Sequence, residues 1–152
     1  MTTFSGGEAL ERKLKELAEN LGDGKVLRVG FLEGAPYDKT GTPVATVAAS
    51  NEFGNPANNQ PPRPFFRSMI ADKSPEWGND LAKIAEAAQF DATEMLGRMG
   101  QHISDQLQAS IRDFTDPPLS PVTVAKKGFS KPLIDTGHML RSVAYDIKDG
   151  TE

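Results

Sequence analysis

The sequence predicts an α+β fold in which a small mixed sheet, built from N-terminal and C-terminal strands, packs against long helices with long exposed loops. Two observations carry this prediction. Apolar residues recur at helical spacing through the middle of the chain, whereas short segments near both ends alternate as strands do. The 152 residues also include 14 glycines and 11 prolines, which favours long, shaped loops between the elements. The length fits a single domain over residues 1–152.

The first element is an N-terminal helix over about 6–21. Ser5 and Glu8 have the spacing of a capping box. Four leucines then follow at helical spacing, namely Leu10, Leu14, Leu17 and Leu21. The glycines after them end the helix, and the β-branched and apolar residues of 25–32 predict the first strand.

A short helix is expected next, with Thr42 as its N-cap, Pro43 as its first residue and Gly54 at its end. A proline-rich loop over about 54–67 follows, and the composition of its residues 55–64 predicts an exposed segment without core residues. The segment 63–69 is compatible with either an extended chain or the start of a helix, because its periodicity does not separate the two.

Central helices are predicted over about 75–113. Ser74 and Pro75 would begin one helix, and Asp91 with Glu94 would cap another. The alternative is one long helix with a kink near Phe90. A C-terminal loop and strand complete the chain over about 115–148, and we expect residues 142–147 to pair with the strand over 26–32.

Composition excludes several classes of protein. The chain has no cysteine, which excludes disulfides, thiolate metal sites and cysteine nucleophiles. With 17 basic and 21 acidic residues, its net charge of −4 argues against the phosphate backbone as the main ligand. No apolar run is long enough for a membrane span, and residues 1–5 do not resemble a secretory signal. We therefore expect a soluble protein of a reducing compartment, with no cofactor and no metal.

The sequence does not predict an enzyme. His102 is expected on a polar helix face, near Asp105 and Glu94 in the sequence. His138 stands close to Asp135, but the members of a catalytic triad usually come from separate elements. Helix capping explains that grouping better than nucleophilic catalysis does.

The candidate functional residues belong instead to an interface. Arginines beside aromatic side chains are typical of interface anchors. If the segment 63–69 is extended, Phe65 and Phe66 point to opposite faces of the chain, so that one ring enters the core and the other meets a partner. The alternative is a loop held to its own domain by both rings. The residues expected to contact another subunit or partner are Asn51, Glu52, Phe53, Gly54, Pro61, Pro62, Arg63, Pro64, Phe65, Phe66, Arg67, Lys126, Lys127, Lys131 and Arg141.

A structural motif is predicted before the last strand. Asp135 or Thr136 would cap a short turn, and Gly137 would allow close packing or an unusual φ. The turn would direct Leu140 inward and Arg141 outward. In this interpretation the motif fixes the register of the terminal strand and carries no chemistry.

Two blocks of sequence resemble a known family. The first is VAASNEFG at 47–54 followed by PPRPFFR at 61–67. The second is LSPVT at 119–123, then Lys127, PLIDTG at 132–137 and LRS at 140–142. Together, and in this order, they are similar to the tail-component proteins of long-tailed bacteriophages, which include tail-completion, neck and minor tail proteins. The resemblance covers roughly residues 25–147.

The resemblance implies a structural virion protein that joins the tail to the head-side connector. Its expected partners are further copies of itself in a ring, which the resemblance suggests is a hexamer, together with the head-side connector or stopper and the tail terminator or tail tube proteins. Genome DNA would pass through without sequence-specific binding, and no membrane would be involved. The expected location is the neck or tail of the virion, after assembly in the host cytoplasm. The alternatives are a DNA-binding assembly factor or a phage hydrolase.

Overall fold

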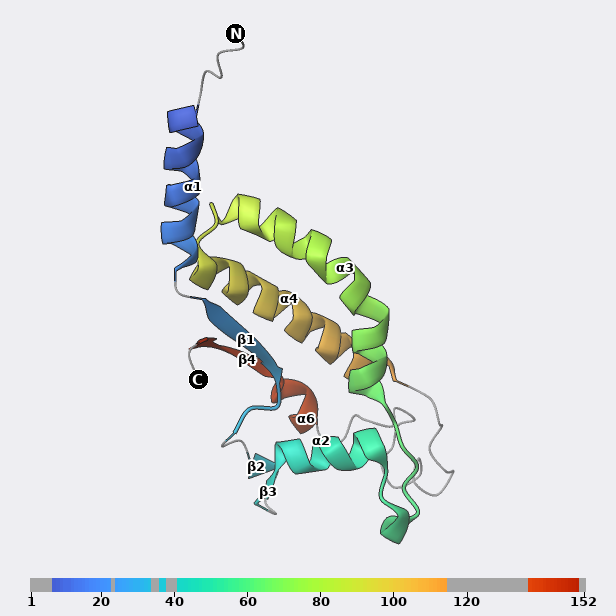
Figure 1. Cartoon of the computed structure of the whole chain (residues 1–152). Coiled ribbons are helices and arrows are strands. Elements are labelled where there is room, and N and C mark those ends of the chain that lie inside the picture. The colour runs from blue at the N-terminus through green and yellow to red at the C-terminus, as the bar shows by residue number, and fades with distance from the viewer. Residues whose placement is uncertain (1–6, 23, 34–35, 38–40, 115–136, 151–152) are drawn as a thin grey trace.

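The computed structural model describes residues 7–22, 24–33, 36–37, 41–114 and 137–150 (Figure 1). In chain order, the elements are α1 (Gly7–Leu21), β1 (Lys25–Gly30), β2 (Pro36–Tyr37), β3 (Thr42–Pro43), α2 (Val44–Phe53), η2 (Pro56–Asn58), α3 (Phe65–Ala87), α4 (Ala92–Asp113), α6 (His138–Arg141) and β4 (Ala144–Asp149). Long helices with a small strand pair confirm the predicted α+β class.

The strands at the two ends of the chain pair as predicted. β1 and β4 are antiparallel, with Leu27 opposite Ile147 and Arg28 opposite Asp146. β2 and β3 form a second antiparallel pair, so each sheet of the described residues is antiparallel and neither is mixed. Arg28 Nε donates to Asp146 Oδ1 at 2.8 Å. This hydrogen bond raises the pKa of Arg28 and lowers the pKa of Asp146.

The central region is two antiparallel helices and not one kinked helix. α3 ends before Gln89 and Phe90, which both adopt positive φ, and the Asp91 side chain then caps α4 by accepting from Glu94 N at 2.8 Å. The predicted start at Ser74 and Pro75 is wrong, because α3 begins at Phe65 and continues through Pro75. Figure 1 shows that α3 curves along its length, as helices with an internal proline do.

The core lies between α3, α4 and the β1–β4 pair. The apolar face expected for α4 is buried at Met99, Ile103, Leu107 and Ile111, and Met95 at its beginning is half-buried. α4 also approaches the sheet closely at Gly100, where a Cβ atom would lie 2.5 Å from Tyr145 Cδ2. A glycine is therefore needed where this helix crosses the strands.

Two predicted helix starts differ from the structure in their caps. Thr42 belongs to β3, and Pro43 takes the N-cap position of α2, so neither has its predicted place.

Before α6, Gly137 occupies the N-cap with φ 70°, which bears out the predicted unusual φ. The proposed caps Asp135 and Thr136 lie outside the described residues. Of the side chains that follow, Met139 is buried, Leu140 is half-buried and Arg141 is exposed.

The predicted range of α1 is confirmed, but its apolar face is not packed against the other described elements as that of an ordinary amphipathic helix would be. It contains no buried residue, and Leu10 and Leu14 remain 61% and 57% exposed. Figure 1 shows α1 extending beyond the helix pair, at the opposite end of the molecule from α2 and η2. The proposed cap Ser5 lies outside the described residues.

Candidate subunit interface

The proline-rich segment is a closed loop that projects beyond α2 and α3 (Figure 1). Backbone hydrogen bonds join Asn55 and Gln60 in both directions, at 2.9 and 3.0 Å. Gly54 begins the loop with φ 78°, and a Cβ atom there would lie 2.8 Å from both Gln60 O and Pro62 N. Only glycine fits this crossing of two chain segments.

Side chains of α2 hold the two ends of this loop together. Asn51 accepts from Gln60 Nε2 at 3.0 Å and donates to Val47 O at the same distance. The backbone carbonyl of Asn51 accepts from Arg63 N at 2.7 Å. The loop is therefore fixed by hydrogen bonds to the preceding helix.

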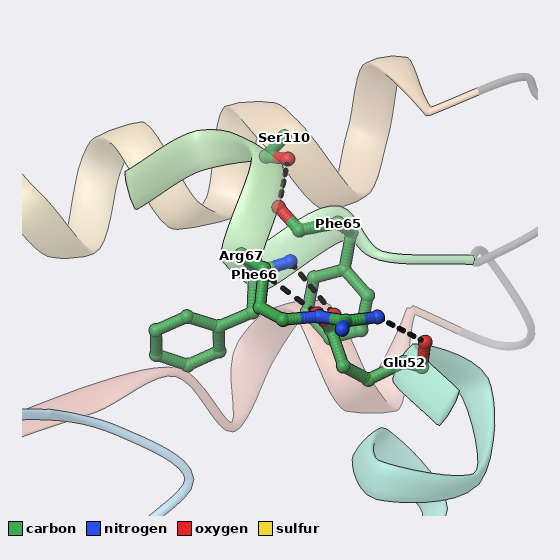
Figure 2. A network of polar contacts seen from close by, with 5 residues as sticks. All are labelled: Glu52, Phe65, Phe66, Arg67 and Ser110. Carbon is green, nitrogen blue, oxygen red and sulfur yellow. Dashed lines mark hydrogen bonds and ion pairs between the residues drawn. The ribbon is translucent and has the colours of Figure 1, made fainter. Parts of the chain in front are cut away.

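Glu52 connects the end of α2 to the start of α3. Its carboxylate accepts from Phe66 N at 2.9 Å and from Arg67 N at 3.1 Å, both in the first turn of α3 (Figure 2). Arg67 Nε donates to the same carboxylate at 2.7 Å. These amides lack partners within their own helix, and a negative charge is favoured at a helix N-terminus. Glu52 thus replaces the side-chain cap that Pro64, the residue at the N-cap position, does not provide.

An aromatic group lies beside this cap. Phe65, Phe66 and Phe31 contact one another edge-on or tilted, with ring centroids 6.2–6.5 Å apart. Phe65 is fully buried, and its carbonyl accepts from Ser110 Oγ of α4 at 2.7 Å (Figure 2). Phe66 is half-buried. The two rings differ in burial as predicted, although the cause is helical geometry and not an extended chain.

An exposed surface remains around Phe53. Its ring is 63% exposed, and the guanidinium carbon of Arg67 lies 5.0 Å above its centroid. A cavity of about 270 Å³ opens beside them, lined by these two residues and by Phe31, Ala45 and Ala49 among others. Arginine stacked on an exposed aromatic ring is the chemistry of an interface anchor.

The structure corrects the extent of the predicted loop. Because α3 begins at Phe65, the loop ends at Pro64 and not at residue 67. The expectation that residues 55–64 are exposed throughout is also wrong, since Arg63 is only 7% exposed. Glu52 is buried as well, at 5%. These side chains position the surface, whereas Phe53, Pro61, Pro62 and Arg67 are exposed on it.

Arg63 differs from every other arginine of this region. It is buried, yet its Nε has no hydrogen-bond partner, and no ion pair among the described residues includes it. Desolvation lowers the pKa of its guanidinium. The neighbouring carboxylate of Glu52 is bonded to Arg67 and to the amides of α3 instead.

The C-terminal candidates are described only in part. Lys126, Lys127 and Lys131 lie outside the described residues. Arg141 is exposed on α6, and a Cβ atom at Gly137 would lie 3.1 Å from its Nη1. α6 contacts both α2 and α4, which places Arg141 on an element beside the loop-bearing helix.

His102 lies between α4 and α3, beside an acidic and an amide side chain. His102 Nε2 lies 3.1 Å from Asp80 Oδ2 and 3.3 Å from Gln106 Nε2. Its acidic neighbour is therefore Asp80 of α3, although Asp105 and Glu94 are nearer in the sequence. The described residues contain no group of three potential metal ligands. They also contain no helix of the length and apolarity that a bilayer crossing requires.

Sequence reasoning missed Ser110 and Phe31, which support the interface from α4 and from the segment after β1. No local pattern marks either residue, because each acts on Phe65 or Phe66 from a distant part of the chain.

No family model, no curated protein and no solved structure matches this chain.

Proposed function

We propose that this chain is a structural subunit of a tailed bacteriophage, in which it joins the tail to the head-side connector as part of a ring. The observation that carries the proposal is the fixed, projecting loop with Phe53 and Arg67 exposed at its base. The two ends of this loop and the residues Asn51, Glu52, Phe53 and Arg67 beside it belong to the two motifs, 47–54 and 61–67, that resemble phage tail components.

The geometry of this loop suits a permanent contact between subunits. A loop already held by Gly54, Asn51 and Glu52 loses little conformational entropy when it docks. Its exposed aromatic ring and arginine are the residue types that contribute most to protein interfaces.

The two ends of the molecule also suit a ring. The projecting loop lies at one end, and the exposed leucines of α1 lie at the other (Figure 1). Head-to-tail contacts between different surfaces of identical subunits generate closed rings when the rotation allows it. The net charge of −4 per chain would also limit binding of the wall of such a ring to passing DNA.

The proposal is tested by removing the gene from the phage that encodes it. We expect filled heads and separate tails that do not join, and we expect the wild-type gene supplied in trans to restore infectious particles. Phe53→Ser should fail to restore them although it folds normally, because this ring is exposed. The matched control is Ile70→Ser, which changes another partly exposed apolar residue away from the loop. Infectious particles in the absence of the gene would contradict the proposal.

A further inference from the structure

The local charges at the base of the loop do not balance. Glu52 supplies one carboxylate, whereas Arg63 and Arg67 supply two guanidinium groups. The carboxylate is bonded to Arg67 and to the first amides of α3, with distances of 2.7–3.1 Å. Among the residues that the structure describes, one positive charge, that of Arg63, is therefore left without a counter-charge.

The burial of Arg63 raises the free-energy cost of leaving its charge unpaired. It is 7% exposed, and its Nε is buried without a hydrogen-bond partner. Its backbone is fixed on both sides, because its amide donates to Asn51 O at 2.7 Å and its carbonyl accepts from Phe65 N at 2.8 Å. The residue also lies just before Pro64, the N-cap of α3, and so near the positive end of that helix. A buried charge is normally paired, so an unpaired one in a fixed backbone points to a missing ligand.

We propose that Arg63 is a receptor for a carboxylate side chain of a neighbouring subunit, a partner that the described part of the chain does not supply. A guanidinium group binds a carboxylate through parallel N–H donors, and its pairing is strongest where water is excluded. That the carboxylate comes from another subunit rests on the proposed assembly function. The affinity of Arg63 for a carboxylate does not rest on it.

Sodium acetate is the probe for the receptor, with sodium chloride at equal ionic strength as the reference. Acetate should raise the melting temperature of the full chain by about 2–4 °C over chloride, because it binds the folded state only. Arg63→Met should abolish this difference. Arg67→Met should keep it, since Arg67 already has Glu52 as its partner.

Arg63→Met also separates a receptor from a structural arginine. In chloride the variant should melt no lower than the wild type, because an apolar side chain of similar size replaces an unpaired buried charge. If the variant does not fold, the Nε–Hε resonance of Arg63 in the wild-type protein provides the same test. That resonance should move saturably with acetate and stay fixed in chloride. Equal behaviour of the wild-type protein in the two salts would overturn the proposal, and so would a folded Arg63→Met that melts far below the wild type in chloride.

Assembly measurements identify the source of the carboxylate. If it belongs to a second copy, Arg63→Met should weaken self-association in sedimentation equilibrium by at least about tenfold. If it belongs to another virion protein, self-association should be unchanged while the variant fails to join heads to tails. Either result supports the receptor. Normal joining by Arg63→Met would overturn it, and the proposed function would remain testable by gene removal.

Discussion

At the scale of single residues, the region is organised by Glu52, a buried acid that spans two helices. It accepts hydrogen bonds from both Phe66 N and Arg67 N and from the Arg67 side chain. The sequence of 47–54 and 61–67 identifies these residues as one group, but it does not show that Glu52 caps the helix to which Phe66 and Arg67 belong. A cap supplied by a residue 14 positions away leaves no local pattern, unlike Asp91, which caps its own helix and was predicted.

Glu52→Gln should lower the free energy of unfolding by about 1.5–3 kcal/mol, the range for hydrogen bonds to a charged group. An amide keeps the shape of the side chain, but it replaces one acceptor oxygen with a donor that faces amide donors of α3. The measurement is urea denaturation at neutral pH. Glu86→Gln on the exposed face of α3 is the control and should change stability by less than about 0.5 kcal/mol. An equal effect of both variants would show that Glu52 is not the cap.

At the scale of elements, the fold follows from patterns that the sequence displays well. The apolar spacing of α4 and the alternation of the two strands predict a buried helix face against a strand pair, and both are present. The start of α3 was not predictable in the same way. Three prolines and an arginine precede it, and its first turn is held by contacts to Glu52 and Ser110. Pro75 lies inside α3 because packing against α4 outweighs the loss of one backbone hydrogen bond.

The crossing of α4 over the sheet provides a test at this scale. Gly100→Ala should destabilise the protein by about 1–3 kcal/mol, because its methyl group would overlap the Tyr145 ring and Leu27. Gly97→Ala lies one turn away on the same helix, with nothing within 4 Å of its Cβ position. It should stabilise by up to about 1 kcal/mol through helix propensity. Thermal unfolding should show a lower melting temperature for Gly100→Ala and a higher one for Gly97→Ala. Changes of the same sign in both variants would contradict the close approach of α4 to the sheet.

At the scale of the whole molecule, the chain divides into a packed part and an extending helix. Leu10, Leu14, Leu17 and Leu21 predict an apolar stripe on α1, and the stripe is present but mostly exposed. The sequence predicts the stripe because it depends only on spacing. It does not predict which surface covers it, since that depends on contacts beyond the helix. Asn20 Nδ2 donates to Gln89 O at 3.1 Å and ties the end of α1 to the turn between α3 and α4.

An exposed stripe makes α1 dispensable for the stability of the single chain. Leu10→Ser combined with Leu14→Ser should change the free energy of unfolding by less than about 0.5 kcal/mol, because neither side chain is buried. Leu107→Ala is the control in the packed part, where a fully buried leucine should cost about 2–5 kcal/mol. Guanidinium denaturation of the three proteins at low concentration measures both effects. In the proposed ring, the same double variant should still reduce head–tail joining, since α1 lies at the end opposite the loop and its leucines are free for a neighbour. A loss of stability close to that of Leu107→Ala would show that α1 belongs to the core of its own chain.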